Sequence, residues 1–431
     1  MLLSKKIRQQ IIDFIKEADK PVSVYSIDVN LDHSFLTVAR DSHISPLMYF
    51  SKPNQTKEYL SVGAWNILTS IEVNNHLNSD CKDVRFFGLQ AFSANEGEPS
   101  DFWLLPILWF EKQEHKTTLN VVVNKLSTPT NQIVDKVNNA LNALTADVAG
   151  IEMPSFSQFT HLPNKEDWHI LVADGKRTIK QGKIEKVVLA RQTTFDFQAN
   201  LNPFTLLIHV QNEDPGVYHF GIRFSSNESF IGGTPERLFE INNNHISSDA
   251  LAGTLFKPHM ANVNQLKQTL IKSKKNIGEH QYVVDFIFDK MKQLCTLDLK
   301  QAELPQVIEL KYLLHLLVCF DGDLKPHVNW LDCLNALHPT PAVAGVPSLE
   351  ALNFINHHEP FKRRWYAGPV GIVSSTDVQM LVAIRSGRVF DNKVALISGA
   401  GIVPQSDADD EWNELDAKIN VFKSIFNGIG S

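Results

Sequence analysis

The sequence predicts an α+β fold whose strands pair mainly antiparallel, rather than a doubly wound α/β fold. Runs of strand-forming residues follow one another through short turns, and Val389–Lys393 has the pattern of a hairpin. Segments with helical spacing of apolar residues occur among these runs in mixed order, as near Val263–Leu294. Because parallel neighbours need a long crossover between them, the short turns favour antiparallel pairing.

The composition is that of an ordinary soluble globular protein, and it disfavours several classes of partner. The chain has 431 residues, 43% hydrophobic and 21% charged, which is enough to bury a sizeable core in one or two domains. Its net charge of −7 disfavours a nucleic acid or an anionic membrane, since no basic surplus is available to neutralise phosphates. The cysteines are widely spaced and form no CxxC pair: Cys81, Cys295, Cys319 and Cys333. We therefore expect reduced thiols and a cytoplasmic location.

The N-terminal part of the chain predicts helices and short strands. Residues 2–19 carry leucine and isoleucine at helical spacing between lysine and glutamine, which predicts an amphipathic surface helix and not a signal peptide. A further helix is predicted over Asn131–Ala149, and a looser stretch with proline and serine follows at Glu152–Pro163. This stretch is the expected boundary between residues 1–160 and residues 161–431.

The other elements follow from alternating or continuous apolar runs, and a last helix is predicted from about Asp407. The predicted strands are Val84–Phe92, Thr118–Val123, Lys186–Phe197, Val217–Phe224, Phe230–Ile231, Val370–Val373, Gln379–Val389 and Lys393–Ser398.

Charged residues on the last predicted helix indicate a cation site. Glu411, Glu414 and Lys418 occupy positions i, i+3 and i+7, so they share one face. Neighbouring carboxylates repel one another unless a lysine or a metal ion compensates them. The alternative is a solvated acidic first turn, with Ser406 capping the helix.

A second carboxylate lies in an apolar setting. Glu279 belongs to a predicted helix, Ile277–Phe288, that is apolar nearly all round. A carboxylate in such a place is paired or binds something, and a salt bridge to a nearby lysine is the ordinary alternative. Mg²⁺ usually takes one or two protein carboxylates with water and substrate oxygens, which Glu279 and Glu414 would suit.

Two further residues are candidates for proton transfer. Lys186 opens the apolar strand Lys186–Arg191, where a lysine with apolar neighbours can act as a base; the alternative is a strand-end lysine that reaches solvent. Glu236 follows a short strand and a tight turn, a usual place for chemistry, but a Pro-Glu pair also starts many helices.

One glycine-rich segment imitates a nucleotide site. Gly399-Ala400-Gly401 follows a predicted strand and precedes a helix, like half of a dinucleotide fingerprint. The third glycine position holds Pro404, and the acidic start of the following helix would repel a pyrophosphate. We therefore exclude a nucleotide at this position.

Taken in order, nine segments resemble the chorismate-utilising enzymes, the family of isochorismate, salicylate, anthranilate and aminodeoxychorismate synthases. They are KVVLAR (Lys186–Arg191), GTPERL (Gly233–Leu238), LAGT (Leu251–Thr254), GEH (Gly278–His280), HPTPAVAG (His338–Gly345), WYAG (Trp365–Gly368), AIR (Ala383–Arg385), GAGIV (Gly399–Val403) and SDADDEWNELDAK (Ser406–Lys418). Each motif is weak alone, but their common order over about residues 165–425 makes the resemblance specific. Ala408 stands where the family usually has proline, which would only preset the first helical turn.

The resemblance implies a fold of two large, mostly antiparallel sheets stacked face to face, with helices outside. The active site would lie at one end of the sheets. Residues 161–431 would form the chorismate-binding catalytic portion, and residues 1–160, which carry no motif, would form a variable N-terminal portion.

The resemblance also implies a Mg²⁺ ion, held by Glu279 and Glu414, with Glu411 supporting it through water. The ring carboxylate of chorismate would complete the coordination of the metal near Gly253 and Thr254.

The remaining substrate contacts are implied in the same way. An arginine fork suits a carboxylate bidentately, and backbone amides suit it as a nest. The residues implied to grip the pyruvyl carboxylate are Tyr366, Arg385, Lys418 and the amides of Gly399, Ala400 and Gly401, while His338 would lie near the ring.

Lys186 is the position that separates the branches of the family. Members that add ammonia have glutamine here, whereas members that add water have lysine, because water is a poor nucleophile and needs a base. Glu236, when protonated, would help the 4-hydroxyl leave as water. Ala252 stands where aminodeoxychorismate synthases have a lysine. The resemblance therefore implies an isochorismate synthase, and the stretch at His358–Phe361 is more similar to the menaquinone-pathway type than to the siderophore type.

Two alternatives remain open. A salicylate synthase performs the same hydration and then eliminates pyruvate, and no residue separates the two activities. A catalytically silent relative that binds chorismate belongs to a different class, but it has no need for a base, an acid and two metal carboxylates together. We expect chorismate as the small-molecule substrate of a monomer with no obligate glutaminase subunit.

Overall fold

The computed structural model describes residues 3–79, 83–93, 100–126, 128–144, 152–258 and 260–428. Cys81 and the end of the predicted helix Asn131–Ala149 lie outside the described residues. The chain is α+β, as predicted, and every strand pair among the described residues is antiparallel.

The strands form two arms that meet at β5 (Asp101–Gln113). The first arm runs, in pairing order, through β1 (Val22–Asp28), β6 (Lys116–Asn124), β5, β3 (Lys57–Leu68), β2 (Leu47–Ser51), β9 (Tyr218–Arg223), β10 (Glu228–Thr234), β19 (Ser386–Phe390), β20 (Lys393–Ile402) and β8 (Lys186–Phe197), with β7 (Phe156–Leu162) and β16 (Gly345–Val346) both paired to β8. The second arm runs through β4 (Phe86–Gln90), β17 (Pro369–Val373), β18 (Asp377–Val382), β11 (Arg237–Asn242), β12 (His245–Phe256) and β15 (Leu313–Asp323), with β13 (Lys300–Gln301) and β14 (Gln306–Glu309) paired to β15.

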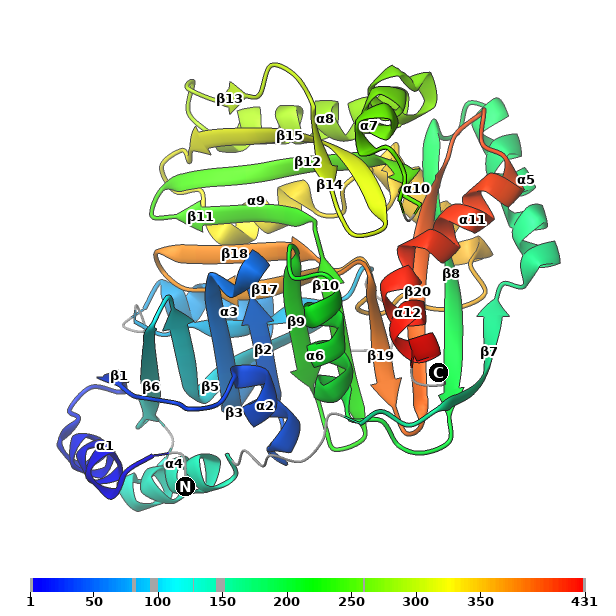
Figure 1. Cartoon of the computed structure of the whole chain (residues 1–431). Helices are drawn as coiled ribbons and strands as arrows, with labels where there is room; N and C mark the ends of the chain where they lie inside the picture. The colour runs from blue at the N-terminus through cyan, green and yellow to red at the C-terminus, as the bar shows by residue number, and fades with distance from the viewer. Residues whose placement is uncertain are drawn as a thin grey trace.

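The main core lies between the two arms. Phe50 of β2 and Phe220 of β9 belong to the same buried cluster as Phe239 of β11 and Met380 of β18. In Figure 1 the strands β15, β12, β11 and β18 of the second arm run across the view, whereas β9, β10, β19, β20 and β8 run up and down it. The pairs β2–β9 and β4–β17 join strands from residues 1–160 to strands from residues 161–431, so both portions contribute to one network of strands.

Alternation along the strands assigns their outer face to the helices. In β2, Met48 and Phe50 enter the main core, whereas Leu47 and Tyr49 point the other way into a second buried cluster. Helices α2, α6 and α12 close this second cluster, and Figure 1 shows α2 and α6 in front of the first arm. Within the described ranges, no helix is both long and apolar enough to cross a membrane. The helices are α1 (Lys5–Glu17), α2 (Phe35–Asp41), α3 (Ser70–Leu77), α4 (Thr130–Asn142), α5 (Lys165–Lys180), α6 (Pro203–Glu213), α7 (Val263–Lys272), α8 (Lys274–Leu294), α9 (Trp330–Leu337), α10 (Ser348–His358), α11 (Ala408–Lys418) and α12 (Asn420–Gly428), with a short 3₁₀ turn at Pro53–Gln55.

Several predicted elements are confirmed. The amphipathic N-terminal helix is α1, which buries Ile11 and Ile15. Strand β8 has the predicted bounds, and the predicted hairpin joins β19 to β20 with Asp391 in the left-handed region at φ 49°.

Two long predicted elements are each divided. The helix near Val263–Leu294 is two helices, because Ser273 has an extended backbone and its side chain caps α8 by accepting from the N–H of Asn276. The strand Gln379–Val389 is likewise divided into β18 and β19. Arg385, at φ 48°, turns the chain between them.

Three other expectations were wrong in detail. The stretch Glu152–Pro163 is not loose throughout, since it contains β7, which pairs with β8. The last helix is capped by Asp407, because Ser406 instead accepts a hydrogen bond from the N–H of Val403. The strand Lys393–Ser398 continues to Ile402, since it stays paired with β8.

Candidate active site

Several of the predicted site residues line one cavity beside β8, β12 and β20. Lys186, Glu411, Glu414, His338, Ala400 and Gly401 are not among its lining residues. The predicted residues that line this cavity are Glu236, Gly253, Thr254, Glu279, Tyr366, Arg385, Gly399 and Lys418. They come from distant parts of the chain, and the antiparallel pairing of β20 with β8 brings the C-terminal motifs against the Lys186 strand.

Lys186 does not reach solvent. Its side chain is fully buried, and Nζ lies 3.1 Å from Oε1 of Glu279 on α8. No atom of the described chain accepts a hydrogen bond of regular geometry from this ammonium. The pair requires glycine at position 401 of the neighbouring strand, because a Cβ there would lie 2.2 Å from Glu279 Oε1 and 3.1 Å from Lys186 Cε.

Each of the three carboxylates predicted to bind metal is paired with a lysine. Glu279 contacts Lys186, and Glu411 Oε1 lies 2.6 Å from Lys275 Nζ. Glu414 Oε1 lies 2.8 Å from Lys418 Nζ, one turn further along α11.

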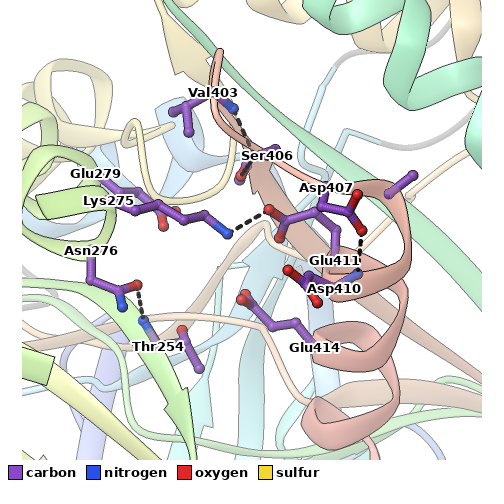
Figure 2. Close-up of polar contacts among 12 residues, drawn as sticks. Thr254, Lys275, Asn276, Glu279, Val403, Ser406, Asp407, Asp410, Glu411 and Glu414 are labelled. Carbon is purple, nitrogen blue, oxygen red and sulfur yellow. Dashed lines mark hydrogen bonds and ion pairs between the residues drawn. The ribbon is translucent and has the colours of Figure 1, made fainter. Parts of the chain in front are cut away.

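The carboxylates of α11 face those of α8. Figure 2 shows Glu411 and Glu414 pointing from α11 toward Lys275 and Glu279. Among the residues that the structure describes, no three His, Cys, Asp or Glu side chains are gathered into a ready metal cluster. The lysine partners account for this, since each carboxylate turns toward its own ammonium group.

Neighbouring charges shift the pKa values of Glu279 and Glu411 in opposite directions. Burial raises the pKa of Glu279, but the ammonium groups of Lys186 and Lys418 outweigh it, and the pKa is lowered overall. Burial and the neighbouring Glu414 raise the pKa of Glu411, although Lys275 opposes them. The crowding of like charges on α11 is the repulsion that the sequence predicted.

Glu236 occupies the turn between β10 and β11. Its backbone is fixed by Thr234, whose Oγ1 accepts from its N–H at 3.2 Å, and by Val382, whose N–H donates to its carbonyl at 3.0 Å. The residue is 4% exposed, and burial raises the pKa of its carboxyl to about 8 in spite of Lys418, Lys186 and Arg385. A carboxyl with this pKa keeps its proton at neutral pH.

His315 is a cavity residue that no sequence motif identified. His315 of β15 lines the cavity, and its Nε2 lies 2.7 Å from Nη2 of Arg385, while its Nδ1 lies 3.3 Å from Oγ1 of Thr254. Burial and the charge of Arg385 hold the pKa of His315 well below its ordinary value, so the neutral ring accepts from the guanidinium. The signal that could have identified it is a histidine inside an otherwise apolar strand, Leu313–Phe320.

A bulge places Thr254 beside this histidine. The register of β12 against β15 shifts between Ala252 and Thr254, and Gly253 between them has φ +70°. A bulge of this kind redirects the next side chain, which glycine permits. The N–H of Thr254 is held by Oδ1 of Asn276 at 3.2 Å, as Figure 2 shows.

The glycine-rich segment lies inside β20 and not in a loop after it. Gly399, Ala400 and Gly401 are paired with Ala190, Leu189 and Val188. The carbonyl of Gly399 accepts from Lys418 Nζ at 2.7 Å, and a Cβ at Gly399 would lie 3.2 Å from Tyr366 Oη. These contacts bring Lys418, Tyr366 and β20 together at one wall of the cavity, while Ala400 belongs to the main core.

His338 lies apart from the residues that line the cavity. It is half-buried, with its ring edge-on to Phe92, and desolvation of the ring lowers its pKa to about 3. Its ring nitrogens have no hydrogen-bond partner within the described ranges.

The comparisons agree with this geometry. The family model described as "Chorismate binding enzyme" matches residues 30–427. The chain belongs to the chorismate binding enzyme family. It is 32% identical over 379 residues to isochorismate synthase MenF of Escherichia coli (strain K12), a match that covers 86% of each chain. It is 28% identical over 383 residues to isochorismate synthase MenF of Haemophilus influenzae, covering 88% of this chain and 86% of that one.

Solved structures of the family share the fold. The structure of MenF, the menaquinone-specific isochorismate synthase from Escherichia coli, matches with a TM-score of 0.89 at 29% identity, over 98% of this chain and 99% of that chain. Anthranilate synthase component I from Streptococcus pneumoniae matches with a TM-score of 0.68 at 18% identity, over 94% and 92% of the two chains, which supports the fold alone. The predicted family and fold class are confirmed.

Proposed function

We propose that this chorismate binding enzyme is an isochorismate synthase that acts in menaquinone biosynthesis. Water would add at C2 of chorismate, and the hydroxyl at C4 would leave as water. The observation that carries the proposal is the buried Lys186 paired with Glu279, a residue that lines the cavity. The ammonia-using branches that the motifs resemble have glutamine in place of this lysine. The match to MenF over most of both chains supports it.

Lys186 and Glu236 would divide the proton transfers. Lys186 would take a proton from the water that attacks C2. Glu236 gives its proton to the hydroxyl that leaves from C4, for which a carboxyl with a pKa of about 8 is suited at neutral pH. One proton is taken and one is given, so the ring gains and loses one water in total.

The donor set fits a hard divalent cation. Glu279, Glu411 and Glu414 offer carboxylate oxygens from two facing helices, and Glu414 raises the pKa of Glu411, a repulsion that a cation would relieve. Glu279 and Glu414 would hold Mg²⁺, with Glu411 supporting it through water. When bound, the metal would supply positive charge for the ring carboxylate of chorismate near Gly253 and Thr254.

The pyruvyl carboxylate would lie against Arg385, Tyr366 and Lys418. His315 orients Arg385 by accepting from its Nη2, so the guanidinium enters the cavity in a fixed position. The amides of Gly399, Ala400 and Gly401, which lie in β20 where it pairs with β8, stay among the proposed substrate contacts. His338 stays the residue proposed to lie near the ring.

We further propose that the chain acts in the cytoplasm as a monomer, without an obligate glutaminase subunit. Lys186 supports the absence of a glutaminase subunit, because a site that adds water does not need a subunit that delivers ammonia. The free thiols Cys295, Cys319 and Cys333 are consistent with a reducing compartment.

Product analysis tests the proposed function. Purified protein is incubated with chorismate and Mg²⁺, with and without ammonium, and the products are separated by chromatography. Isochorismate without ammonium is the expected product. Salicylate with stoichiometric pyruvate would instead assign a salicylate synthase, and anthranilate would contradict both.

A further inference from the structure

The edge of β8 that faces away from β20 is covered by strands only in part. β16 pairs with Lys186 and Val187, and β7 pairs from Gln192 onward. Between these two partners, the residues from Val188 to Arg191 have no strand neighbour on this edge among the described residues. Buried N–H and C=O groups need hydrogen-bond partners, so something else must complete the ladder here.

Two side chains complete it. The N–H of Ala190 donates to Oε1 of Glu359 at 2.8 Å, and the carbonyl of Val188 accepts from Nη2 of Arg363 at 2.7 Å. The N–H of Val188 donates to the carbonyl of Ala344 at 2.8 Å. Carboxylate and guanidinium thus stand where a neighbouring strand would place its carbonyl and amide groups.

The same two side chains form a buried bidentate ion pair. Arg363 Nε lies 2.9 Å from Glu359 Oε2, and Nη2 lies 2.5 Å from Oε1, with the side chains 3% and 2% exposed. Arg363 Nη1 also donates to the carbonyl of Val343 at 2.8 Å, and the guanidinium lies over the ring of Phe92 at 4.5 Å. Charge-assisted bonds in a bidentate geometry are the strong and directional ones.

The segments joined by this pair form one wall of the cavity. Val188, Val343 and Arg363 itself line it, and Tyr366 follows Arg363 by one turn of chain. Lys186 lies two residues before Val188 on the same face of β8. A shift of β8 at Val188 would therefore move the Lys186 ammonium relative to Glu279 and the cavity.

We infer that the Glu359–Arg363 ion pair is a positioning device that fixes the Lys186 strand against the active-site wall. This inference rests on the proposed function, because it takes Lys186 as the catalytic base. Arg363 acts through the strand and not on the substrate, because Nε, Nη1 and Nη2 are already engaged by Glu359, Val343 and Val188. Glu359 thus gives the stretch His358–Phe361 a physical role, which is to hold β8 through the N–H of Ala190.

The test removes both charges together. Replacing a buried ion pair by apolar residues of similar volume often leaves stability unchanged or higher, whereas removing one partner strands a buried charge. The double variant Glu359→Met/Arg363→Met strands no charge, but it leaves the N–H of Ala190 and the carbonyls of Val188 and Val343 without these partners, so it is expected to fold with a lowered melting temperature. Its kcat should nevertheless fall by roughly 10²-fold, the usual effect of a small misplacement of a reacting group, with KM for chorismate changed less than about threefold. Hydrogen exchange of the β8 peptide should be faster than in wild type.

A second variant and a control keep the test decisive. If the double variant does not fold, Arg363→Lys retains one charge but cannot reach Glu359, Val343 and Val188 together, and the same loss of kcat at unchanged KM is expected. Arg40→Met/Asp41→Met, which removes a partly buried bidentate pair on α2, is the control and should leave kcat and β8 exchange unaltered.

Two outcomes would overturn the inference. A folded double variant with wild-type kcat and wild-type β8 exchange would show that the pair serves stability alone, and a large rise in KM would make Arg363 a substrate ligand. The exchange measurement needs no substrate. If wild type fails to convert chorismate, the proposed function fails, and β8 exchange alone decides whether the pair fixes the strand.

Discussion

Lys186 Nζ lies 3.1 Å from Glu279 Oε1 in the interior of the protein, so the proposed base and a proposed metal ligand share one contact. The two residues come from β8 and α8, and glycine at position 401 provides the space in which they meet. A change at either residue is therefore expected to affect both proton transfer and the metal.

Lys186→Gln should lower the rate of hydration by roughly two to four orders of magnitude, the usual value of general-base catalysis. The affinity for chorismate should change far less, because Arg385, Tyr366 and Lys418 are proposed to bind it. Isochorismate formation and chorismate binding are measured side by side, with and without ammonium. Near-normal hydration would remove Lys186 as the base.

Glu279→Gln and Glu414→Gln should each abolish turnover and weaken Mg²⁺ binding, because each removes one charged oxygen ligand. Calorimetric titration with Mg²⁺ measures the binding directly, and circular dichroism checks the fold. Glu350→Gln, at an exposed position of α10 that does not line the cavity, is a control that should leave Mg²⁺ affinity unchanged. Wild-type affinity in either site variant would exclude that residue from the metal site.

Lys275→Met should increase the affinity for Mg²⁺ severalfold, an effect of the size expected for a partly exposed ion pair. Lys275 contacts Glu411 at 2.6 Å, and the pKa of its ammonium is raised because Glu411, Glu414 and Glu279 outweigh its burial. Removing the ammonium leaves a more negative cluster for a dication, while the metal-free protein should lose stability. Weaker Mg²⁺ binding would show that Lys275 assists the metal instead of competing with it.

The pH dependence should report Glu236. Burial raises the pKa of its carboxyl to about 8, above the value of about 4.3 of an exposed glutamate. Between these two pKa values the folded chain holds a proton on Glu236 that the unfolded chain has released. The free energy of unfolding therefore decreases as pH rises from about 4.3 toward 8. The same ionisation removes the proposed acid, so kcat should fall as pH rises through about 8. The free energy of unfolding and kcat are measured from pH 5 to 9. In Glu236→Gln the free energy of unfolding should depend less on pH. An unchanged pH dependence in this variant would show that another group causes it.

His315→Phe should weaken chorismate binding by about tenfold while leaving Mg²⁺ binding intact, because Arg385 loses the acceptor that orients it. His315→Gln, which can still accept at a similar position, should recover part of the affinity. Equal loss in both variants would mean that the imidazole contributes something other than this hydrogen bond.

The sequence by itself determined the family, the α+β class and several of the residues that line the cavity. Strand and hairpin patterns are local, and the motifs around Lys186, Glu236, Glu279 and Glu414 are read directly along the chain. The bounds of β8 and the hairpin before β20 followed for the same reason.

Only the tertiary structure decided how these residues are paired. The contacts Glu279–Lys186 and Glu411–Lys275 each join elements distant in the chain, and such contacts depend on packing that no local pattern records. His315 and the Glu359–Arg363 pair became part of the site only when β15 and β8 reached their neighbours. A buried polar group must find its partner in the fold, and the identity of that partner is a property of the whole chain.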